Sequence, residues 1–474
     1  MRLALHWFRN DLRLADNRAL AEACGADVLA PVFVFDERLL AARSMGAPRV
    51  RFLRECVAAL AERLEARGSR LCVRRGDPRI VIPALARELR ADVVTWNRDE
   101  TPYARRRDAV VRESLRQAGV QVRECLDRTV FDADAVRTRE GRPFTVYTPF
   151  RRAWWRRFEG DPPEPAPARR LPGSPARRTA GGLPSAEALG ACDFEGRLPK
   201  AGEEAARRRL RAFLGRDAAH YAKRRDFPAL DATSRLSPYL RFGAISIRAC
   251  FREAREAAAD DARAARGIAK WLDELVWREF YAAILASFPH VLRGAFRPEY
   301  DRMRWDDDAR GYRAWCEGHT GFPFVDAGMR QLRETGWMHN RVRMVVASFL
   351  AKDLLMDWRR GERFFLQRLV DGDPASNDGG WQWAASTGTD AQPYFRIFNP
   401  VAQGLRFDPD GVYVRRYVPE LALLTGATAH EPWKSPGAAR HYPARIVDHA
   451  ERRQEALARY RDARATRTDT ARPS

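Results

Sequence analysis

The stretch DGDPASNDGGWQWAASTGTDAQPYFRIFNP, residues 371–400, is the segment around which the rest of the chain can be interpreted. It sets two tryptophans, two residues apart, among glycines, prolines and small polar residues. Gly and Pro weaken a helix, and Asn, Asp and Ser side chains compete for its backbone hydrogen bonds. The composition therefore predicts either a shaped, partly buried loop that meets a ligand or a connector whose rings plug the core.

Length, composition and charge limit the class of protein. A chain of 474 residues predicts about two or three domains, and 45% hydrophobic residues suffice for true cores. The formal net charge of +21 favours a polyanionic partner such as nucleic acid, and we expect no membrane association. Only five of the 84 basic residues are Lys, however, so the Arg and Ala bias of a GC-rich genome could account for part of this charge.

Cysteine and histidine usage points to an intracellular protein without a metal. The seven cysteines are dispersed and form no C-x-x-C pair, which is typical of reduced thiols in a cytoplasm. The eight histidines lack the spacing of metal ligands. No apolar run reaches 18 residues, so we expect neither a signal peptide nor a membrane span.

The first 130 residues alternate strand and helix signals, which predicts βαβ units and a parallel sheet covered by helices. The expected strands are 3–8, 28–35, 70–74, 92–96 and 120–123, with helices near 49–67, 78–90 and 104–118. The first strand–helix turn carries no G-x-G-x-x-G. This α/β domain is therefore not expected to be a standard dinucleotide site.

Composition changes after Phe158, where a stretch rich in Pro, Gly, Ala and Arg predicts a long inter-domain connection. We place an α/β domain at 1–130, a linker at 131–202 and an all-α domain at 203–474. Amphipathic patterns in the last of these predict helices near 203–215, 245–258, 266–287, 323–335, 339–357 and 361–370. The final segment, 451–474, is expected to be a solvated, charged helix that frays into a tail.

Tryptophan is concentrated in the helical part, where eight of the 13 fall between residues 271 and 383. A single buried Trp is usually a core residue, but here the rings share helix faces with polar side chains. Spacing of i, i+3, i+7 and i+10 puts a mixed set on one face: Trp271, Glu274, Arg278 and Tyr281. Glu274 and Arg278 are either an i,i+4 ion pair or the polar edge of a pocket.

Two further segments mix polar and apolar residues in the same way. In GWMHNRVRM, residues 336–344, Asn340 and Met344 fall on one side of an expected helix. This pattern fits a ligand-facing surface as well as it fits an interior helix with a hydrogen-bonded Asn.

The segment 221–240 carries hydroxyl groups just before an expected helix. Thr233, Ser234 and Ser237 offer side-chain oxygens and backbone N–H groups, an arrangement that suits a phosphate. Plain N-capping is the alternative. The basic residues 223–225 stand beside them and could meet a nucleic-acid backbone.

Together these motifs resemble the DNA photolyase/cryptochrome family, and within it the class I cyclobutane pyrimidine dimer photolyases, or deoxyribodipyrimidine photo-lyases. The resemblance runs from Trp7 to about Trp433 and is most specific at 233–240, 277–281, 336–344 and 371–400. It implies an antenna domain, a helical domain that binds FAD, and light-dependent DNA repair. In that repair, blue light drives electron transfer from reduced FAD, which splits a dimer flipped out of DNA. We also expect a cytoplasmic monomer without a metal.

The resemblance assigns roles to individual residues. Contacts to FAD are expected from Tyr221, Thr233, Ser234, Arg235, Leu236, Ser237, Trp271, Glu274, Arg278, Asn340, Arg343, Asp371, Gly372, Asp373 and Asn377. Catalytic contacts to flavin and dimer are expected from Glu274, Asn340 and Met344. An electron-transfer chain is expected along Trp381, Trp358 and Trp305. Contacts to DNA are expected from Arg225, Trp277, Arg278, Arg341, Trp383, Arg396 and Gln403.

The resemblance is weaker at the antenna. Folate-binding members carry an Asn-Glu pair where this chain has Tyr103 and Ala104. The segment WNRDETPY, residues 96–103, together with Arg49, is closer to deazaflavin-binding members, although the match is imperfect around residues 100–101. We therefore expect a deazaflavin, with methenyltetrahydrofolate or an empty site as alternatives.

The main alternative function is that of a cryptochrome photoreceptor. Plant-type receptors carry Asp, and animal-type receptors Cys, where this chain has Asn377, and the chain also has Glu274 and Met344. A (6-4) photolyase would be expected to carry His at positions 340 and 344. A generic flavin oxidoreductase would explain neither the series of tryptophans nor the basic charge. The residues thus favour the dimer photolyase.

Overall fold

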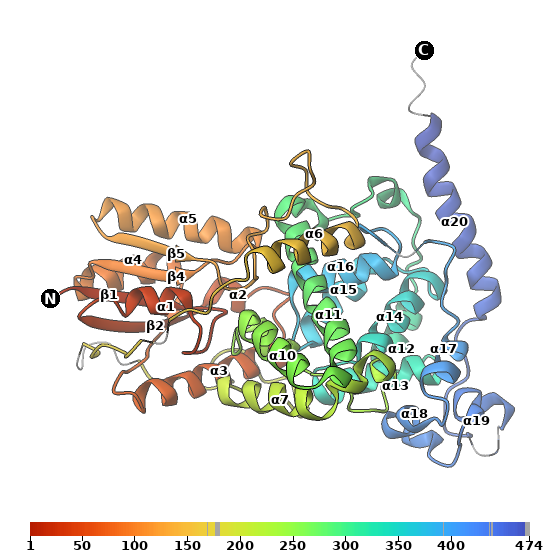
Figure 1. Ribbon diagram of the computed structural model, residues 1–474. Helices are drawn as coiled ribbons and strands as arrows, with labels where there is room; N and C mark the ends of the chain where they lie inside the picture. The colour runs from red at the N-terminus through yellow and green to blue at the C-terminus, as the bar shows by residue number, and fades with distance from the viewer. Residues whose placement is uncertain (168, 176–180, 392, 436, 438, 470–474) are drawn as a thin grey trace.

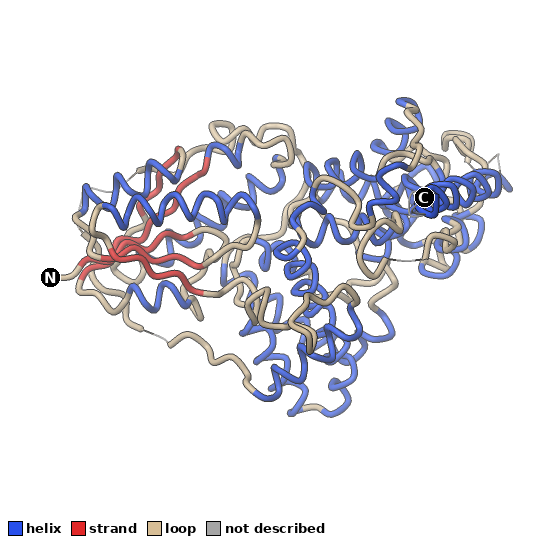
Figure 2. The backbone as a smooth tube through the Cα atoms, turned by 90° about the horizontal axis from the view of Figure 1, so that it is seen from above, coloured by secondary structure: helices blue, strands red, loops and turns tan. Residues whose placement is uncertain are grey.

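The computed structural model describes residues 1–167, 169–175, 181–391, 393–435, 437 and 439–469. An α/β domain comes first, and a larger helical domain lies beside it (Figure 1). The strands gather in one half of the molecule (Figure 2). This arrangement confirms the fold class predicted from the sequence.

The α/β domain is built on a five-stranded sheet whose strand pairs are all parallel, in the order β3-β2-β1-β4-β5. The expected strands are present within two residues of their predicted limits. They are β1 (Leu3–Phe8), β2 (Val28–Asp36), β3 (Cys72–Gly76), β4 (Val93–Asn97) and β5 (Gln121–Cys125). The helices are α1 (Arg18–Ala23), α2 (Glu37–Leu40), α3 (Ala47–Glu65), α4 (Pro78–Leu89) and α5 (Pro102–Gln117).

The two faces of this sheet belong to different cores. Successive side chains of a strand point to opposite faces. Leu5 and Trp7 of β1 accordingly share a cluster with residues of α4 and α5. Phe8 instead joins Phe52 of α3 in a cluster that continues into the helical domain. One face of the sheet thus supports the second domain directly.

The helical domain supplies most of the chain's secondary structure. Its elements up to the long central helix are α7 (Glu203–Arg216), α8 (Tyr221–Arg224), α9 (Ser237–Arg241), α10 (Ile247–Asp260) and α11 (Ala262–Ser287). The later helices are α12 (Ala309–Glu317), α13 (Pro323–Thr335), α14 (Asn340–Ser348), α15 (Trp358–Arg368), α16 (Pro374–Ala384), α17 (Pro400–Phe407), α18 (Val412–Tyr417), α19 (Ala427–His430) and α20 (His449–Asp469). The expected helix 339–357 is interrupted, because α14 passes into a π-helical turn at Phe349–Asp353.

The expected linker 131–202 is more than a connector. It contains the helix α6 (Tyr147–Gly160), which packs on α11. Phe150, Trp154 and Phe158 recur every four residues on its buried side. The Trp154 Nε1 atom donates to Glu279 Oε2 at 2.8 Å. The aromatic stripe makes the first part of this segment a component of the helical core, which its flanking Pro and Arg content conceals.

The loop expected at 371–400 contains a helix, so that prediction was wrong for residues 374–384. The Asp373 side chain caps α16 by accepting the Ser376 N–H at 3.0 Å, and Pro374 stands at its first position. Gly379 allows α16 to lie close to α11, since a Cβ on this residue would be 2.2 Å from the Tyr281 ring. Capping and tertiary contact therefore override the weak helix propensity of this sequence. The described residues 385–391 and 393–399 are irregular, as expected.

The end of the chain also differs from expectation. The helix α20 runs along the outer edge of the helical domain (Figure 1) and buries Ala456, Tyr460 and Ala463 against Tyr300. The predicted tail at 470–474 lies outside the described residues. No helix in the described part of the chain is long and apolar enough to cross a membrane.

Buried ion pairs join the two domains. Asp127, which follows β5, accepts from Arg13 at 2.6 Å and from Arg248 of α10 at 2.8 Å. Arg248 also pairs with Asp16 at 3.0 Å. Buried charges are tolerated when each is paired and hydrogen-bonded, so these contacts fix the relative position of the domains.

Candidate functional site

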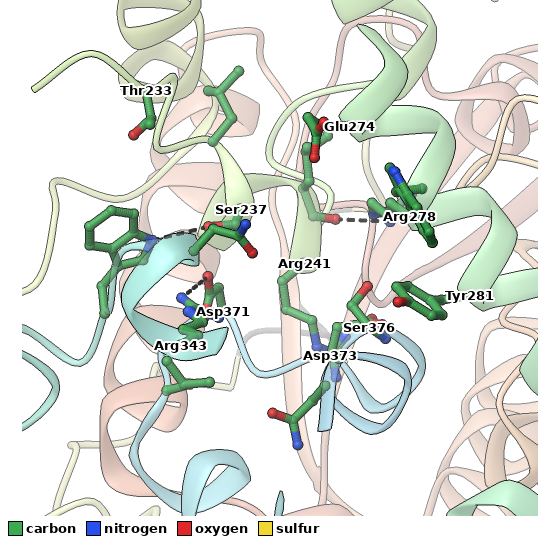
Figure 3. A pocket seen from close by; sticks show the side chains of 18 of the residues that line it. Thr233, Ser237, Arg241, Glu274, Arg278, Tyr281, Arg343, Asp371, Asp373 and Ser376 are labelled. Atoms are coloured by element: carbon green, nitrogen blue, oxygen red, sulfur yellow. Dashed lines mark hydrogen bonds and ion pairs between the residues drawn. The ribbon is translucent and has the colours of Figure 1, made fainter. Parts of the chain in front are cut away.

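A cavity of about 520 Å³ opens into the helical domain between α11, α14, α16 and the segment that precedes α9. Every residue expected to contact FAD lines it, as do the three expected catalytic residues. Glu274 and Thr233 lie toward one end of the cavity, and Asp371 and Asp373 toward the other (Figure 3). The sequence prediction of a ligand-facing segment at 371–400 is thus supported by its position.

The helix α11 forms one wall. Trp271, Glu274, Arg278 and Tyr281 all line the cavity, as their spacing predicts. Glu274 pairs with Arg225 and lies 3.3 Å from Lys270 Nζ. Arg278 does not pair with Glu274; its Nη1 atom donates to the backbone oxygen of Arg128 at 2.7 Å. The expected alternative of a simple Glu274–Arg278 ion pair is therefore not what this helix face forms.

The segment Thr233–Ser237 forms a polar rim. The indole N–H of Trp271 donates to Ser234 Oγ at 3.1 Å, and that of Trp337 to Ser237 Oγ at 3.3 Å. Arg235 has a φ of 48°, which is uncommon for a residue other than glycine and is characteristic of functional sites. Among the described residues, α9 begins without a side-chain cap, so N-capping does not explain these hydroxyl groups. Oriented hydroxyls and helix-start N–H groups suit a phosphate.

Four arginines bind the short segment Asp371–Asp373, which lies toward the opposite end of the cavity from Thr233 (Figure 3). Two of them bind the carbonyl oxygen of Gly372, and the other two pair with the flanking carboxylates. The contacts are Arg49 Nη1 and Arg241 Nε to Gly372 O at 2.8 and 2.9 Å, Arg343 Nη2 to Asp371 Oδ2 at 2.9 Å, and Arg128 to Asp373. Two of these arginines, Arg49 and Arg128, come from the α/β half of the chain.

This cationic surrounding keeps Asp373 charged. Burial acts to raise the pKa of Asp373, but the charges of Arg128, Arg241 and Arg278 outweigh it and hold the pKa below its usual value. A charged Asp373 both caps α16 and anchors the domain contact. Because α16 carries other lining residues, this carboxylate helps to set their positions.

Asn377 is held from outside the cavity. Its Nδ2 atom donates to the backbone oxygen of Glu362 at 3.0 Å and to Glu362 Oε1 at 2.9 Å. Burial raises the pKa of Glu362. In α14, Asn340 Nδ2 lies 3.7 Å from Met344 Sδ, so these two side chains do stack on one side of the helix.

The three expected electron-transfer tryptophans lie on connected elements. Trp381 lines the cavity, and its ring packs against Gly361 of α15 so closely that a Cβ there would lie 2.1 Å away. Trp358, fully buried, is the first residue of α15. The segment that bears Trp305 is joined to the residues before α15 by the Asp306 N–H, which donates to Leu355 O at 2.7 Å. Trp305 itself is half-buried.

The residues expected to contact DNA divide into two groups. Arg225, Trp277, Arg278 and Trp383 line the cavity, whereas Arg341, Arg396 and Gln403 are not among its lining residues. Arg341 pairs with Asp226 at 2.9 Å and lies over the Phe407 ring. Arg396 is exposed, and Gln403 is half-buried. Arg225, expected to face phosphate, is occupied here by Glu274.

Sequence reasoning missed several residues of the site. Arg241, Lys270, Trp337, Ser376 and Gly380 line the cavity and stand beside motifs that were recognised, so adjacency could have indicated them. Arg128 and Glu362 reach the site from distant parts of the chain. No local pattern announces them, because their role depends on the tertiary fold.

Arg49, which was one basis for expecting a deazaflavin antenna, makes hydrogen bonds to the helical domain. This side chain is buried and donates to the backbone oxygens of Gly372 and Leu366, so it serves the contact between domains. The Tyr103 hydroxyl donates to Asp36 Oδ2 at 2.7 Å. A second cavity, of about 10 Å³, lies near Asn10 and Asp99. The expectation of a deazaflavin, with folate as alternative, stays a prediction.

Comparison with known proteins bears on this site. The family model of DNA photolyase matches residues 4–169, and that of the FAD binding domain of DNA photolyase matches residues 271–462. The chain belongs to the DNA photolyase family. A deoxyribodipyrimidine photo-lyase from Halobacterium salinarum is 45% identical over 98% of this chain and 99% of the relative.

Solved structures of a photolyase and of a cryptochrome have the same fold as this chain. A class III photolyase from Agrobacterium tumefaciens is 38% identical, covers 98% of both chains and superposes with a TM-score of 0.90. A Synechocystis cryptochrome is 29% identical, with 97% and 99% covered and a TM-score of 0.87. The predicted family and the FAD cofactor are confirmed. The subclass, class I, stays a prediction.

The cavity fits FAD. It offers oriented hydroxyls for a phosphate at Thr233–Ser237, an indole wall at Trp271, and an Asp–Arg pair at Asp371 and Arg343 for a polar ring edge. Among the described residues, no group of three or more His, Cys, Asp or Glu side chains could hold a metal ion.

Proposed function

We propose that this photolyase repairs DNA in light by splitting cyclobutane pyrimidine dimers, as a carbon–carbon lyase. One observation carries the proposal: Glu274, Asn340 and Met344 line the same cavity as the expected FAD contacts, and Trp277 and Trp383 share it. When bound and reduced, FAD supplies an electron under blue light. The dimer would accept this electron and return it to the flavin after the two bonds of its cyclobutane ring have broken, so that the reaction would need no external oxidant or reductant.

The charged groups at the wall support this role. Arg225 and Lys270 flank Glu274. Their positive charge favours a dimer that is gaining an electron, because preorganised charges act strongly in a site that excludes water. Glu274 is proposed to hydrogen-bond the flipped base, since it lines the cavity beside these cations. The carboxylate is held by both cations and therefore needs little reorganisation on binding.

Recognition of a flipped dimer requires aromatic walls and phosphate contacts outside them. Trp277 and Trp383 are proposed as the walls, since both are half-buried and border the cavity. Arg341, Arg396 and Gln403 are proposed to meet the strand beyond the cavity. Their separation from the cavity suits this division, because phosphates remain outside when a base turns inward.

Trp381, Trp358 and Trp305 are proposed to deliver electrons to oxidised FAD in light. The series leads from the cavity wall through a fully buried ring to a half-buried one. Such a path connects the buried cofactor to reductants in solution. Asn377 is proposed to contact the flavin, with Glu362 holding its amide in place.

A cryptochrome photoreceptor is the second candidate, favoured by the likeness to a Synechocystis cryptochrome. The two functions share the FAD cavity and differ in whether dimers are split. The decisive test reduces the FAD of the purified protein chemically and illuminates it with blue light in the presence of an oligonucleotide holding one thymine dimer. We expect loss of the dimer in light and none in darkness. Absence of repair in light would favour the photoreceptor.

Glu274→Ala sharpens this test, with Glu256→Ala as its control. Glu256 is an exposed glutamate of α10. We expect Glu274→Ala to lower the repair yield while FAD stays bound, and Glu256→Ala to leave both unchanged. Loss of FAD from the Glu274 variant would reassign this residue to folding. A monomeric state and a cytoplasmic location stay predictions.

A further inference from the structure

The first turn of α6 packs against Trp277, one of the residues that line the cavity. The Tyr147 ring is stacked on the Trp277 ring, with their centroids 3.5 Å apart and their planes 11° from parallel. Trp277 borders the cavity, and Tyr147 is buried. The tyrosine ring thus packs flat against one face of Trp277 and limits how that ring can tilt.

The same turn also holds the loop that follows α16. The backbone N–H of Tyr147 donates to Asp390 Oδ2 at 3.0 Å, and the Thr389 hydroxyl donates to the carbonyl oxygen of Thr145. This loop, residues 385–391, follows the end of α16, which bears Trp383. Asp390 has a φ of 44°, so its backbone stays in a conformation that needs support from its surroundings.

Tyr147 is itself held in one orientation. Its hydroxyl donates to the backbone oxygen of Asp273 at 2.7 Å. Two neighbours on α6 bind the side chain of that residue, Arg151 Nε at 2.5 Å and Trp155 Nε1 at 3.1 Å from Asp273 Oδ1. Burial raises the pKa of Tyr147, so its hydroxyl remains a donor at neutral pH.

We propose that Tyr147 is a positioning residue for lesion recognition, which holds Trp277 and the loop 385–391 at a fixed separation. This inference rests on the proposed function, in which Trp277 and Trp383 are the walls for a flipped dimer. A single residue touches the back of one wall through its ring and the loop beside the other wall through its backbone. Preorganised walls lower the entropy lost on binding, so the effect should appear in affinity for damaged DNA.

Three variants of the FAD-loaded protein test this. Tyr147→Phe keeps the stack and the backbone contact and loses the hydroxyl. Tyr147→Leu keeps apolar volume without a flat ring. Tyr312→Leu is the matched control, since Tyr312 also stacks on a tryptophan, Trp315, at 6.0 Å and 22°, away from the cavity lining.

The measurement is the dissociation constant, in darkness, for an oligonucleotide with one thymine dimer and for its undamaged counterpart. Aromatic stacks contribute roughly threefold to tenfold to an equilibrium constant. We expect Tyr147→Leu to weaken binding of the damaged strand by about that factor, and binding of undamaged DNA and FAD content to stay unchanged. Tyr147→Phe and Tyr312→Leu should keep the damaged-to-undamaged ratio of the parent protein.

Other outcomes overturn the proposal. Equal weakening of binding to both oligonucleotides would make Tyr147 a general structural residue, and unchanged binding of both in Tyr147→Leu would leave it without a role in lesion recognition. If that variant does not fold, Asp390→Gly replaces it, because glycine tolerates the positive φ and removes the acceptor of the Tyr147 N–H. Its unchanged ratio would equally count against the proposal. A parent protein without preference for the dimer would instead remove the proposed function, and the positioning role with it.

Discussion

The two domains of this molecule use buried arginine and aspartate side chains differently: in the α/β domain they fill the edge of the sheet, and in the helical domain they border an open cavity. Ligands of open parallel sheets usually bind at the carboxyl ends of the strands. Here that edge is filled by its own side chains: Arg9 pairs with Asp108 at 2.6 Å, Arg107 contacts Asp36 at 3.3 Å, and Asn97 Nδ2 donates to Asp11 Oδ2 at 2.6 Å. In the helical half, the arginines bind backbone oxygens and carboxylates at the cavity wall and leave about 520 Å³ open.

This difference teaches that a fold pattern alone does not locate the site. The Rossmann-like alternation of the first domain would direct attention to the sheet edge. The cavity instead lies in the helical domain, where arginine contacts to the segment Asp371–Asp373 leave the space beside it open. Breaking either kind of arrangement should therefore have different consequences, stability in the first half and cofactor chemistry in the second.

The largest effect is expected from Asp108→Ala. This change leaves the buried Arg9 guanidinium without its carboxylate partner, while Arg107 keeps only its contact with Asp36, so the free energy of unfolding should fall by about 3–5 kcal/mol. Denaturant unfolding should show the loss, whereas the visible spectrum of bound FAD should not change. A spectral change would mean that the two halves are less separate than their contacts indicate.

The second largest effect is expected from Gly361→Ala. This change should lower the free energy of unfolding by about 3 kcal/mol, because the added methyl group would overlap the Trp381 ring. Gly215→Ala in the exposed part of α7 is the matched control, since its Cβ meets open space. That control should be neutral or slightly stabilising, as Ala favours a helix over Gly. Thermal unfolding of both variants checks the pair. A mild effect at Gly361 would show that Trp381 can shift at low cost.

The pH dependence of stability should reflect Glu279. Burial raises its pKa from 4.5 to about 7. Folding then favours the protonated form, so this contribution is complete below pH 4.5 and disappears as the pH rises through about 7, with a magnitude of about 3 kcal/mol. Glu279→Gln should flatten this part of the profile in unfolding measured from pH 5 to 8. An equally steep profile in that variant would assign the dependence to other groups.

Trp381→Phe should slow light-driven reduction of oxidised FAD by at least about tenfold, or about 1.4 kcal/mol in activation free energy. Repair by chemically reduced protein should persist. Trp315→Phe is the control, because the Trp315 ring lies 6.1 Å from Trp381 and outside the expected series. Absorbance under blue light follows the reduction. Normal photoreduction in the Trp381 variant would refute the assigned electron path.

Much of the fold could be predicted because its signals are local. Strand alternation places all five strands within two residues, and the amphipathic pattern gives α13 its observed limits, Pro323–Thr335. The helix α16 was missed because its stability comes from the Asp373 cap and the fit of Gly379 against Tyr281. Propensity cannot register a partner that lies about a hundred residues away in the chain.

The site shows the same division. Motif residues such as Glu274 and Asn340 could be placed in one cavity from the family resemblance, since each motif is continuous in sequence. Arg128, Glu362 and Tyr147 could not, because each acts through another residue across a domain or helix contact. Positioning residues of this kind become visible when the chain is folded.

The contacts of Arg49 with Gly372 and of Arg128 with Asp373 limit which first domains can be joined to this second domain. Arg49 and Arg128 belong to the first domain, yet they complete the backbone and side-chain contacts of a segment in the second. The halves are therefore not interchangeable modules. A chimera that imports a foreign first domain, for example to change the antenna, should retain guanidinium groups at positions equivalent to 49 and 128. Without them, the graft would deprive buried Asp373 of its ion-pair partner and the Gly372 carbonyl of one of its two guanidinium donors.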